Sequence, residues 1–134
     1  GLAHAGWKGT DLKIAQKMVK TMVKEFGTDP SHLVVGFGPS IHSCCLKFDN
    51  PIQESLPAWT LFLKKLADGQ TSINVRGYNL FQLTEVGVEQ ENIFMSEYCT
   101  AHSDNFFSHY RDIHDKKTEA RFAAVISLNP QSHF

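Results

Sequence analysis

Apolar residues recur at helical spacing between Asp11 and Phe26. Those that share one face are Leu12, Ala15, Val19, Met22, Val23 and Phe26. The opposite face carries Lys13, Lys17, Lys20 and Lys24. This pattern predicts an amphipathic helix whose lysines form a solvated face, and only secondarily a docking stripe for an acidic partner. Thr10 is its predicted N-cap, and Gly27 is the predicted residue after its end.

Short apolar runs along the rest of the chain predict strands. They cover residues 33–37, 44–48, 73–75, 93–95 and 122–128, and residues 1–3 have the character of a strand end. A second helix is predicted from Arg76 to Val86, with Gly87 as its stop, and one or two short helices are predicted between residues 51 and 70. The order strand, helix, strand at the start favours a layered α/β arrangement.

Composition narrows the functional classes. The chain has 134 residues, 42% hydrophobic and 20% charged, which suits one globular domain with a buried core. A formal net charge of −1 speaks against nucleic acid and anionic membranes as partners, and no apolar run has the length of a transmembrane helix. Three cysteines, two of them adjacent as Cys44 and Cys45, make a poor disulfide framework and favour a reducing cytoplasm.

The segment from His4 to Thr10, with the sequence HAGWKGT, is the first candidate for chemistry. Its imidazole lies at a predicted strand-to-helix junction, where it could bind a metal or move a proton, or simply hydrogen-bond at a strand end. The N–H groups that follow Gly9 and the guanidinium of Arg111 are candidate anion donors. For Arg111, a salt bridge within the fold is the alternative.

Cysteine and histidine spacing provides a second candidate. Cys99 and His102 form a C-x-x-H half-site, and His42 with Cys44 could complete a closed tetrahedral zinc centre. The alternatives are small buried cysteines, or a nucleophilic pair in which Cys44 or Cys45 is activated by a histidine. The sequence contains no P-loop, no dinucleotide-binding glycine fingerprint and no G-x-S-x-G elbow.

Five motifs, taken in order, resemble those of one family. They are HAGWKGT at residues 4–10, GPSI at 38–41 with Cys44 and Cys45, Asn79 after a short strand, Cys99-Thr100, and FFS at 106–108 with Arg111-Asp112. The family is the laccase-domain family, also called multicopper polyphenol oxidoreductases, purine nucleoside phosphorylases or peptidoglycan editing factors. The resemblance runs from Gly1 to about Leu128.

The resemblance implies a layered α/β sandwich of mixed sheets flanked by helices, similar to the catalytic domain of cytotoxic necrotizing factor. It also implies a metal, usually zinc, held by two His and one Cys. His4 maps onto one of these ligands, whereas the others lie in motifs that would precede residue 1. Residues 1–134 are therefore expected to be the C-terminal portion of a single laccase-type domain. The upstream strands would be missing, which would leave unpaired edges and exposed core.

The function implied is that of a zinc-dependent purine nucleoside phosphorylase acting on adenosine, inosine or methylthioadenosine, with adenosine deaminase activity. It belongs to the full-length parent, and this chain alone is expected to be inactive. His4 would be catalytic and metal-binding, and Gly9, Thr10 and Arg111 would contact the substrate phosphate. Copper-dependent polyphenol oxidation, peptidoglycan precursor editing and a non-catalytic remnant are the alternatives. The expected partners are a purine nucleoside and phosphate, without nucleic acid or membrane, in the cytoplasm.

Overall fold

A computed structural model describes residues 1–115 and 120–127. Its α-helices are α1 (Trp7–Asp11), α2 (Ile14–Phe26), α3 (Val75–Thr84) and α4 (His109–His114). Its strands are β1 (Val35–Phe37), β2 (Lys47–Phe48), β3 (Leu63–Lys65), β4 (Thr71–Ile73) and β5 (Ile93–Met95). Short 3-10 helices are η1 (Pro30–His32), η2 (Ile52–Ser55), η3 (Pro57–Phe62) and η4 (Gln90–Asn92). The predicted mixed α/β fold is confirmed, whereas the likeness to cytotoxic necrotizing factor stays a prediction.

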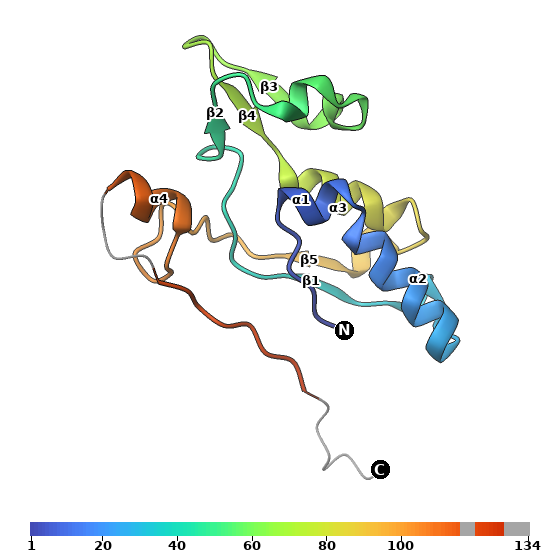
Figure 1. The fold of residues 1–134 in the computed structure, drawn as a ribbon. Helices are drawn as coiled ribbons and strands as arrows, with labels where there is room; N and C mark the ends of the chain where they lie inside the picture. The colour runs from blue at the N-terminus through green and yellow to red at the C-terminus, as the bar shows by residue number, and fades with distance from the viewer. Residues whose placement is uncertain (116–119, 128–134) are drawn as a thin grey trace.

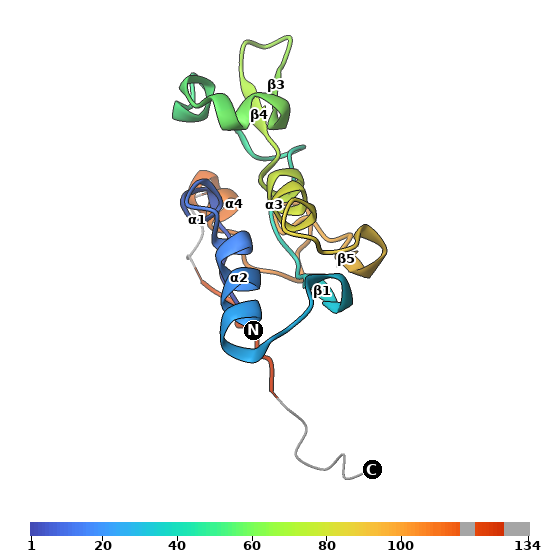
Figure 2. The same ribbon diagram turned by 90° about the vertical axis from the view of Figure 1, so that its right-hand side faces the viewer.

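The strands form two small sheets of opposite kind (Figure 1). β1 and β5 pair in parallel, with Val35 opposite Ile93 and Phe37 opposite Met95. β2, β4 and β3 make an antiparallel sheet in which β4 is central. Helices α2 and α3 lie along the parallel pair. The antiparallel sheet lies beyond the N-terminal end of α3 (Figure 2).

The first predicted helix is interrupted near its start. Gly6 is the N-cap of α1, and Lys13 adopts the left-handed conformation (φ 59°) that separates α1 from α2. Thr10 lies inside α1, so the prediction that it caps a helix from Asp11 is wrong. The predicted stop is confirmed, because Gly27 has φ 64° and its N–H bonds back to the carbonyl of Val23.

Two apolar clusters hold these layers together. Val19 of α2, Leu83 of α3 and Val88 are buried against the inner face of β1 and β5, beside Val35 and Ile93. In the second cluster, Trp59, Ile73 and Tyr78 are buried between η3, β4 and α3, and the ring of Phe62 stacks on that of Tyr78 at 4.6 Å. Such burial of apolar surface is the main stabilising term for both layers.

A polar contact joins the second cluster to α1. The indole Nε1–H of Trp59 donates to Asp11 Oδ1 at 2.9 Å. Trp59 itself is fully buried, and the end of α1 is therefore held to the layer that carries η3.

Several predicted strands differ from the structure. Of residues 73–75 only Ile73 lies in a strand, because Asn74 caps α3 and Val75 begins it. Of residues 33–37 only Val35–Phe37 form a strand. Residues 122–127 are extended and exposed, without a strand partner among the described residues, and Leu128 lies outside that part of the chain. Residues 1–3 are likewise irregular, and within 44–48 only Lys47 and Phe48 form a strand. The physical reason is pairing: an apolar run becomes a strand only where a neighbouring strand accepts its hydrogen bonds, and none in the described chain does so for 122–127.

The outer face of the parallel pair is open. Phe94 of β5 alternates with the buried-side residues Ile93 and Met95, and 62% of it is exposed. Other large apolar side chains that are mostly exposed include Leu2, Val34, Val125 and Ile126. No helix among the described residues has the length and apolar character needed to cross a membrane.

Candidate functional site

His4 lies in the irregular segment that leads into α1. The imidazole is exposed, and Gly6 packs so closely beneath it that a Cβ at Gly6 would meet His4 Nε2 at 2.9 Å. A Cβ at Gly9 would meet the His4 carbonyl oxygen at 3.2 Å. Both glycines of the HAGWKGT motif therefore allow close approach to His4, as expected where backbone must pass near a functional group.

Thr10 belongs to a buried polar network. Its hydroxyl donates to the Ala5 carbonyl at 3.2 Å and accepts from Asn79 Nδ2 at 2.7 Å. Gln82 Nε2 donates to the Thr10 carbonyl at 2.7 Å, and all three side chains are buried. Thr10 thus links α1 to α3.

The N–H groups after Gly9 are engaged in the fold. Thr10 N donates to Gly6 O at 2.8 Å, Leu12 N donates to Lys8 O, and Lys13 N donates to Thr10 O. These three N–H groups therefore already have acceptors within the fold. The assignment of Gly9 and Thr10 to the substrate stays a prediction.

Arg111 holds a loop together. Its Nη1 donates to the carbonyls of Thr100 and Ser103 at 3.1 and 2.8 Å, and Nη2 donates to Phe106 O at 2.9 Å. Nε donates at 3.1 Å to the buried carboxylate of Asp112. Four of the five guanidinium N–H donors therefore meet protein acceptors. The salt bridge that was the alternative for Arg111 is present, and a phosphate contact stays a prediction.

Cys44, Cys45, Cys99 and His102 converge on one point. Their ligand atoms all lie within 4.8 Å of one another. Cys44 and Cys45 lie in a turn before β2, and Cys99 to His102 lie between β5 and α4 (Figure 1). A parallel bridge between Ser40 and Cys99 aligns the two segments. Of the sequence-predicted tetrahedral set, Cys44, Cys99 and His102 come together.

His42 is the member of that set which the structure places elsewhere. Its Nε2 contacts Nη1 of Arg76, whose Nη2 donates to the Ser96 carbonyl at 2.8 Å. Cys45 takes its place in the cluster, with Sγ 3.0 Å from His102 Nε2. Sequence spacing could not select between His42 and Cys45. The conformation of the turn at residues 43–45 decides which of the two side chains points toward Cys99 and His102.

The thiols differ in their electrostatic surroundings. Burial raises the pKa of Cys45 to about 12, and hydrogen bonds with Cys44 and Cys99 add to that effect. Burial also acts to raise the pKa of Cys99, but backbone N–H groups of His42, Ala101 and His102 donate to its sulfur and hold that pKa below its usual value. Of these two thiols, Cys99 therefore loses its proton at the lower pH.

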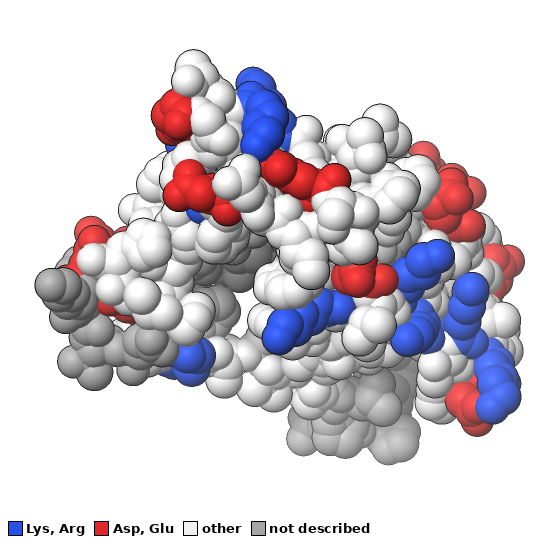
Figure 3. Space-filling view, turned by 45° about the horizontal axis from the view of Figure 1, so that its top comes forward, with Lys and Arg blue, Asp and Glu red and all other residues white. Residues whose placement is uncertain are grey.

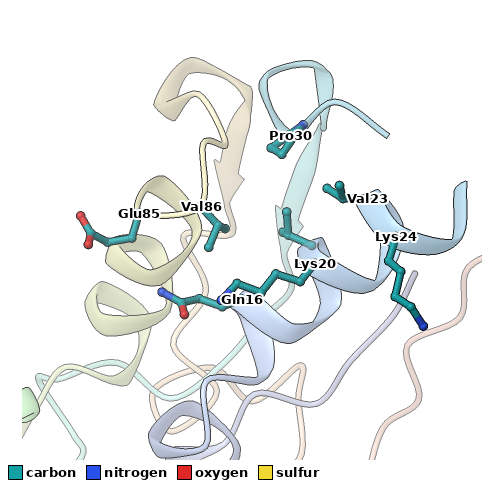
Figure 4. Close-up of a pocket in the computed structure, with 8 residues that line it drawn as sticks. Gln16, Lys20, Val23, Lys24, Pro30, Glu85 and Val86 are labelled. Atoms are coloured by element: carbon teal, nitrogen blue, oxygen red, sulfur yellow. The ribbon is translucent and has the colours of Figure 1, made fainter. Parts of the chain in front are cut away.

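Two further surface features lie away from these residues. A groove of ≈ 520 Å³, open to solvent, runs between α2 and the segment after α3 and is lined by Val19, Lys20, Pro30 and Val86, among others (Figure 4). None of the sequence-predicted site residues lines it. Basic side chains gather near α2, with acidic side chains beside them (Figure 3), so this face has mixed charge.

His4 itself has a sparse donor environment. Among the described residues, it is not part of any group of three or more potential metal ligands. A zinc ion in a catalytic site needs about three protein ligands. The residues present here therefore do not complete a metal site around His4.

Comparison with known proteins defines the class. The family model for multi-copper polyphenol oxidoreductase laccase matches residues 1–129, and the chain belongs to this family. It is 36% identical to purine nucleoside phosphorylase YlmD of Geobacillus stearothermophilus over 132 residues, covering 94% of this chain and 47% of that protein. It is 29% identical to adenosine deaminase RL5 from an unknown prokaryotic organism, covering 80% of this chain and 43% of that protein.

The solved structures agree. The crystal structure of YlmD from Geobacillus stearothermophilus matches with a TM-score of 0.74 and 35% identity, over 83% of this chain and 43% of that one. The chain thus spans about half the length of the relatives it matches. The family resemblance carried by HAGWKGT and the cysteine motifs is confirmed.

Proposed function

We propose that this chain is the C-terminal portion of a metal-dependent purine nucleoside phosphorylase. The proposal is supported chiefly by its 36% identity, over 94% of its length, to a protein named as such. Its candidate metal ligand is the exposed imidazole of His4, against which Gly6 and Gly9 pack closely. The remaining ligands would come from the part of the relatives' length that this chain does not span.

The open face of the parallel pair supports the same proposal. A parallel sheet is normally covered on both faces, yet Phe94 on the outer face of β1 and β5 is largely exposed. Upstream strands and helices would cover this face in a complete domain. Zinc is the metal expected, and activity is expected only when those elements are present.

Two measurements on the full-length protein test the proposal. Wild-type enzyme should convert inosine and phosphate to hypoxanthine and ribose 1-phosphate, and His4→Ala should lose this activity by more than about 100-fold, together with one zinc per chain. His32→Ala, at an exposed histidine in η1, is the matched control and should change neither. Absence of phosphorolysis by folded, zinc-loaded wild-type protein would overturn the proposal.

Arg111 and the substrate phosphate need a separate test. If the remaining guanidinium donor contacts phosphate, full-length Arg111→Ala should raise the KM for phosphate while the KM for inosine stays near its wild-type value. An unchanged KM for phosphate in folded Arg111→Ala would assign this side chain to the loop carbonyls alone.

Adenosine deamination is the second candidate activity. It is supported by the similarity to a protein named adenosine deaminase. Release of ammonia and inosine from adenosine in the absence of phosphate distinguishes it from phosphorolysis. The same His4→Ala variant should abolish it if one site carries both reactions.

A further inference from the structure

We propose that Cys44, Cys45, Cys99 and His102 bind one zinc ion in a closed structural site, separate from any metal held by His4. The inference rests on this cluster alone and is independent of the proposed function.

The spacing of the donor atoms suits a tetrahedral ion. Zn–S bonds of ~2.3 Å at tetrahedral angles place two sulfurs about 3.8 Å apart, and Cys44 Sγ lies 3.8 Å from Cys45 Sγ. For one sulfur and one nitrogen, the same geometry with Zn–N of ~2.0–2.1 Å requires about 3.6 Å. The His102 ring lies beside both sulfurs, with Nε2 3.0 Å from Cys45 Sγ and Nδ1 3.9 Å from Cys44 Sγ, and the four ligand atoms lie within 4.8 Å of one another.

The chemistry of the donors selects the ion. Three sulfurs and one imidazole form a soft set that suits zinc and disfavours magnesium or calcium, which prefer oxygen ligands. The cysteines are free thiols, and each that ligates zinc releases its proton to solvent. Four protein ligands fill the tetrahedron and leave no position for substrate, so the role of this ion is structural.

The surroundings already have the form of a second shell. Cys99 is buried, and its sulfur accepts a hydrogen bond from the backbone N–H of His42 at 3.4 Å. Such an N–H group orients a metal-bound thiolate and offsets its charge. Cys44 and His102 are exposed, which provides the entry path that a zinc site requires.

Zinc here would join two distant parts of the chain. The turn with Cys44 and Cys45 precedes β2, whereas Cys99 and His102 belong to the loop that Arg111 holds through the carbonyls of Thr100 and Ser103. The ion would therefore fix that loop against the turn that precedes β2.

The test uses full-length protein, loaded with zinc chloride or cobalt chloride under reducing conditions. In a His4→Ala background, the protein should keep one zinc per chain, and cobalt should give the intense thiolate-to-cobalt charge-transfer absorption of a three-sulfur tetrahedral site. Adding Cys45→Ser or His102→Ala should weaken zinc binding by more than about 100-fold, while adding His32→Ala should leave it unchanged.

One variant separates loss of a ligand from loss of folding. His102→Cys should keep one zinc and strengthen the charge-transfer absorption, because a fourth thiolate replaces the imidazole. A folded His4→Ala protein without zinc, or a disulfide among Cys44, Cys45 and Cys99 in reduced, freshly isolated protein, would overturn the proposal. Full-length protein with His4 intact that shows the cobalt absorption but no phosphorolysis would instead support the cluster and contradict the proposed function.

Discussion

Thr10 and Asn79 hold the HAGWKGT segment to α3 through hydrogen bonds. Thr10 is fully buried and links Ala5 on its own segment to Asn79 on α3. Removing the hydroxyl would leave the Ala5 carbonyl with only the 3.5 Å contact from Asn79 Nδ2, and would leave Asn79 Nδ2 with its bond to Val75 O and that weak contact. The loss of a buried hydrogen bond is destabilising. The network therefore fixes the position of the HAGWKGT segment relative to α3.

Thr10→Val should lower the free energy of unfolding by about 1–3 kcal/mol, since it keeps the shape of the side chain but removes the hydroxyl that pairs with Ala5 and Asn79. Urea unfolding followed by circular dichroism measures this change. Thr21→Val, at an exposed position of α2, is the matched control and should shift stability by less than about 0.5 kcal/mol. Equal effects of the two variants would contradict a structural role for the Thr10 hydroxyl.

Residue-level prediction from sequence succeeded where a motif was local. The C-x-x-H spacing correctly marked Cys99 and His102 as neighbours in one turn, and Cys44 meets them. The choice of Cys45 over His42 as the fourth member depends on a contact with a segment 57 residues away in the sequence. The same limitation applies to Arg111, whose carbonyl acceptors belong to a loop conformation that no residue pattern specifies.

At the scale of elements, helix ends depend on single backbone conformations. Gly27 has φ 64°, and nothing lies within 4 Å of the Cβ that a larger residue would add. The cost of a side chain there is therefore conformational rather than steric.

Gly27→Ala should destabilise the protein by about 1 kcal/mol, because an L-residue disfavours the left-handed region that ends α2. Gly36→Ala is the control, since this position in β1 lacks a positive φ and also has open space around its Cβ. Its effect on thermal or urea unfolding should be smaller than that of Gly27→Ala. The reverse order would show that α2 does not require the glycine at its end.

Helices and the central strand pair were predictable because their patterns are local. The stripe of α2 and the strand 93–95 agree with the structure, whereas α3 ends at Thr84, before the predicted stop at Gly87. The break at Lys13 was missed, since a left-handed lysine has no sequence signature. The expected strand at 122–128 failed over its described part because strand formation depends on a neighbour that propensity cannot supply.

At the scale of the whole molecule, the uncovered face of β1 and β5 governs solution behaviour. Phe94 is exposed on a parallel pair that has no further strand among the described residues. Such surfaces favour contact between molecules.

The 134-residue chain alone should self-associate with rising concentration, and Phe94→Ser should weaken this association by removing apolar area from the open face. Sedimentation velocity measures the effect. Phe26→Ser, at an exposed phenylalanine of α2, is the control and should leave association largely unchanged. A monomeric wild-type chain at all concentrations would contradict this prediction.

The pairing of β1 with β5 should be a late step in folding, because the two strands are far apart in the sequence. β3 and β4 are joined by a short turn, with Lys65 opposite Thr71, so closing this hairpin fixes few intervening residues. Val35 meets Ile93 only after η2, η3, the antiparallel sheet and α3 have been bridged, and such distant contacts form slowly. The β3–β4 hairpin and η3 should therefore form first. The parallel pair and the nearby cluster of Cys44, Cys45, Cys99 and His102 should form last.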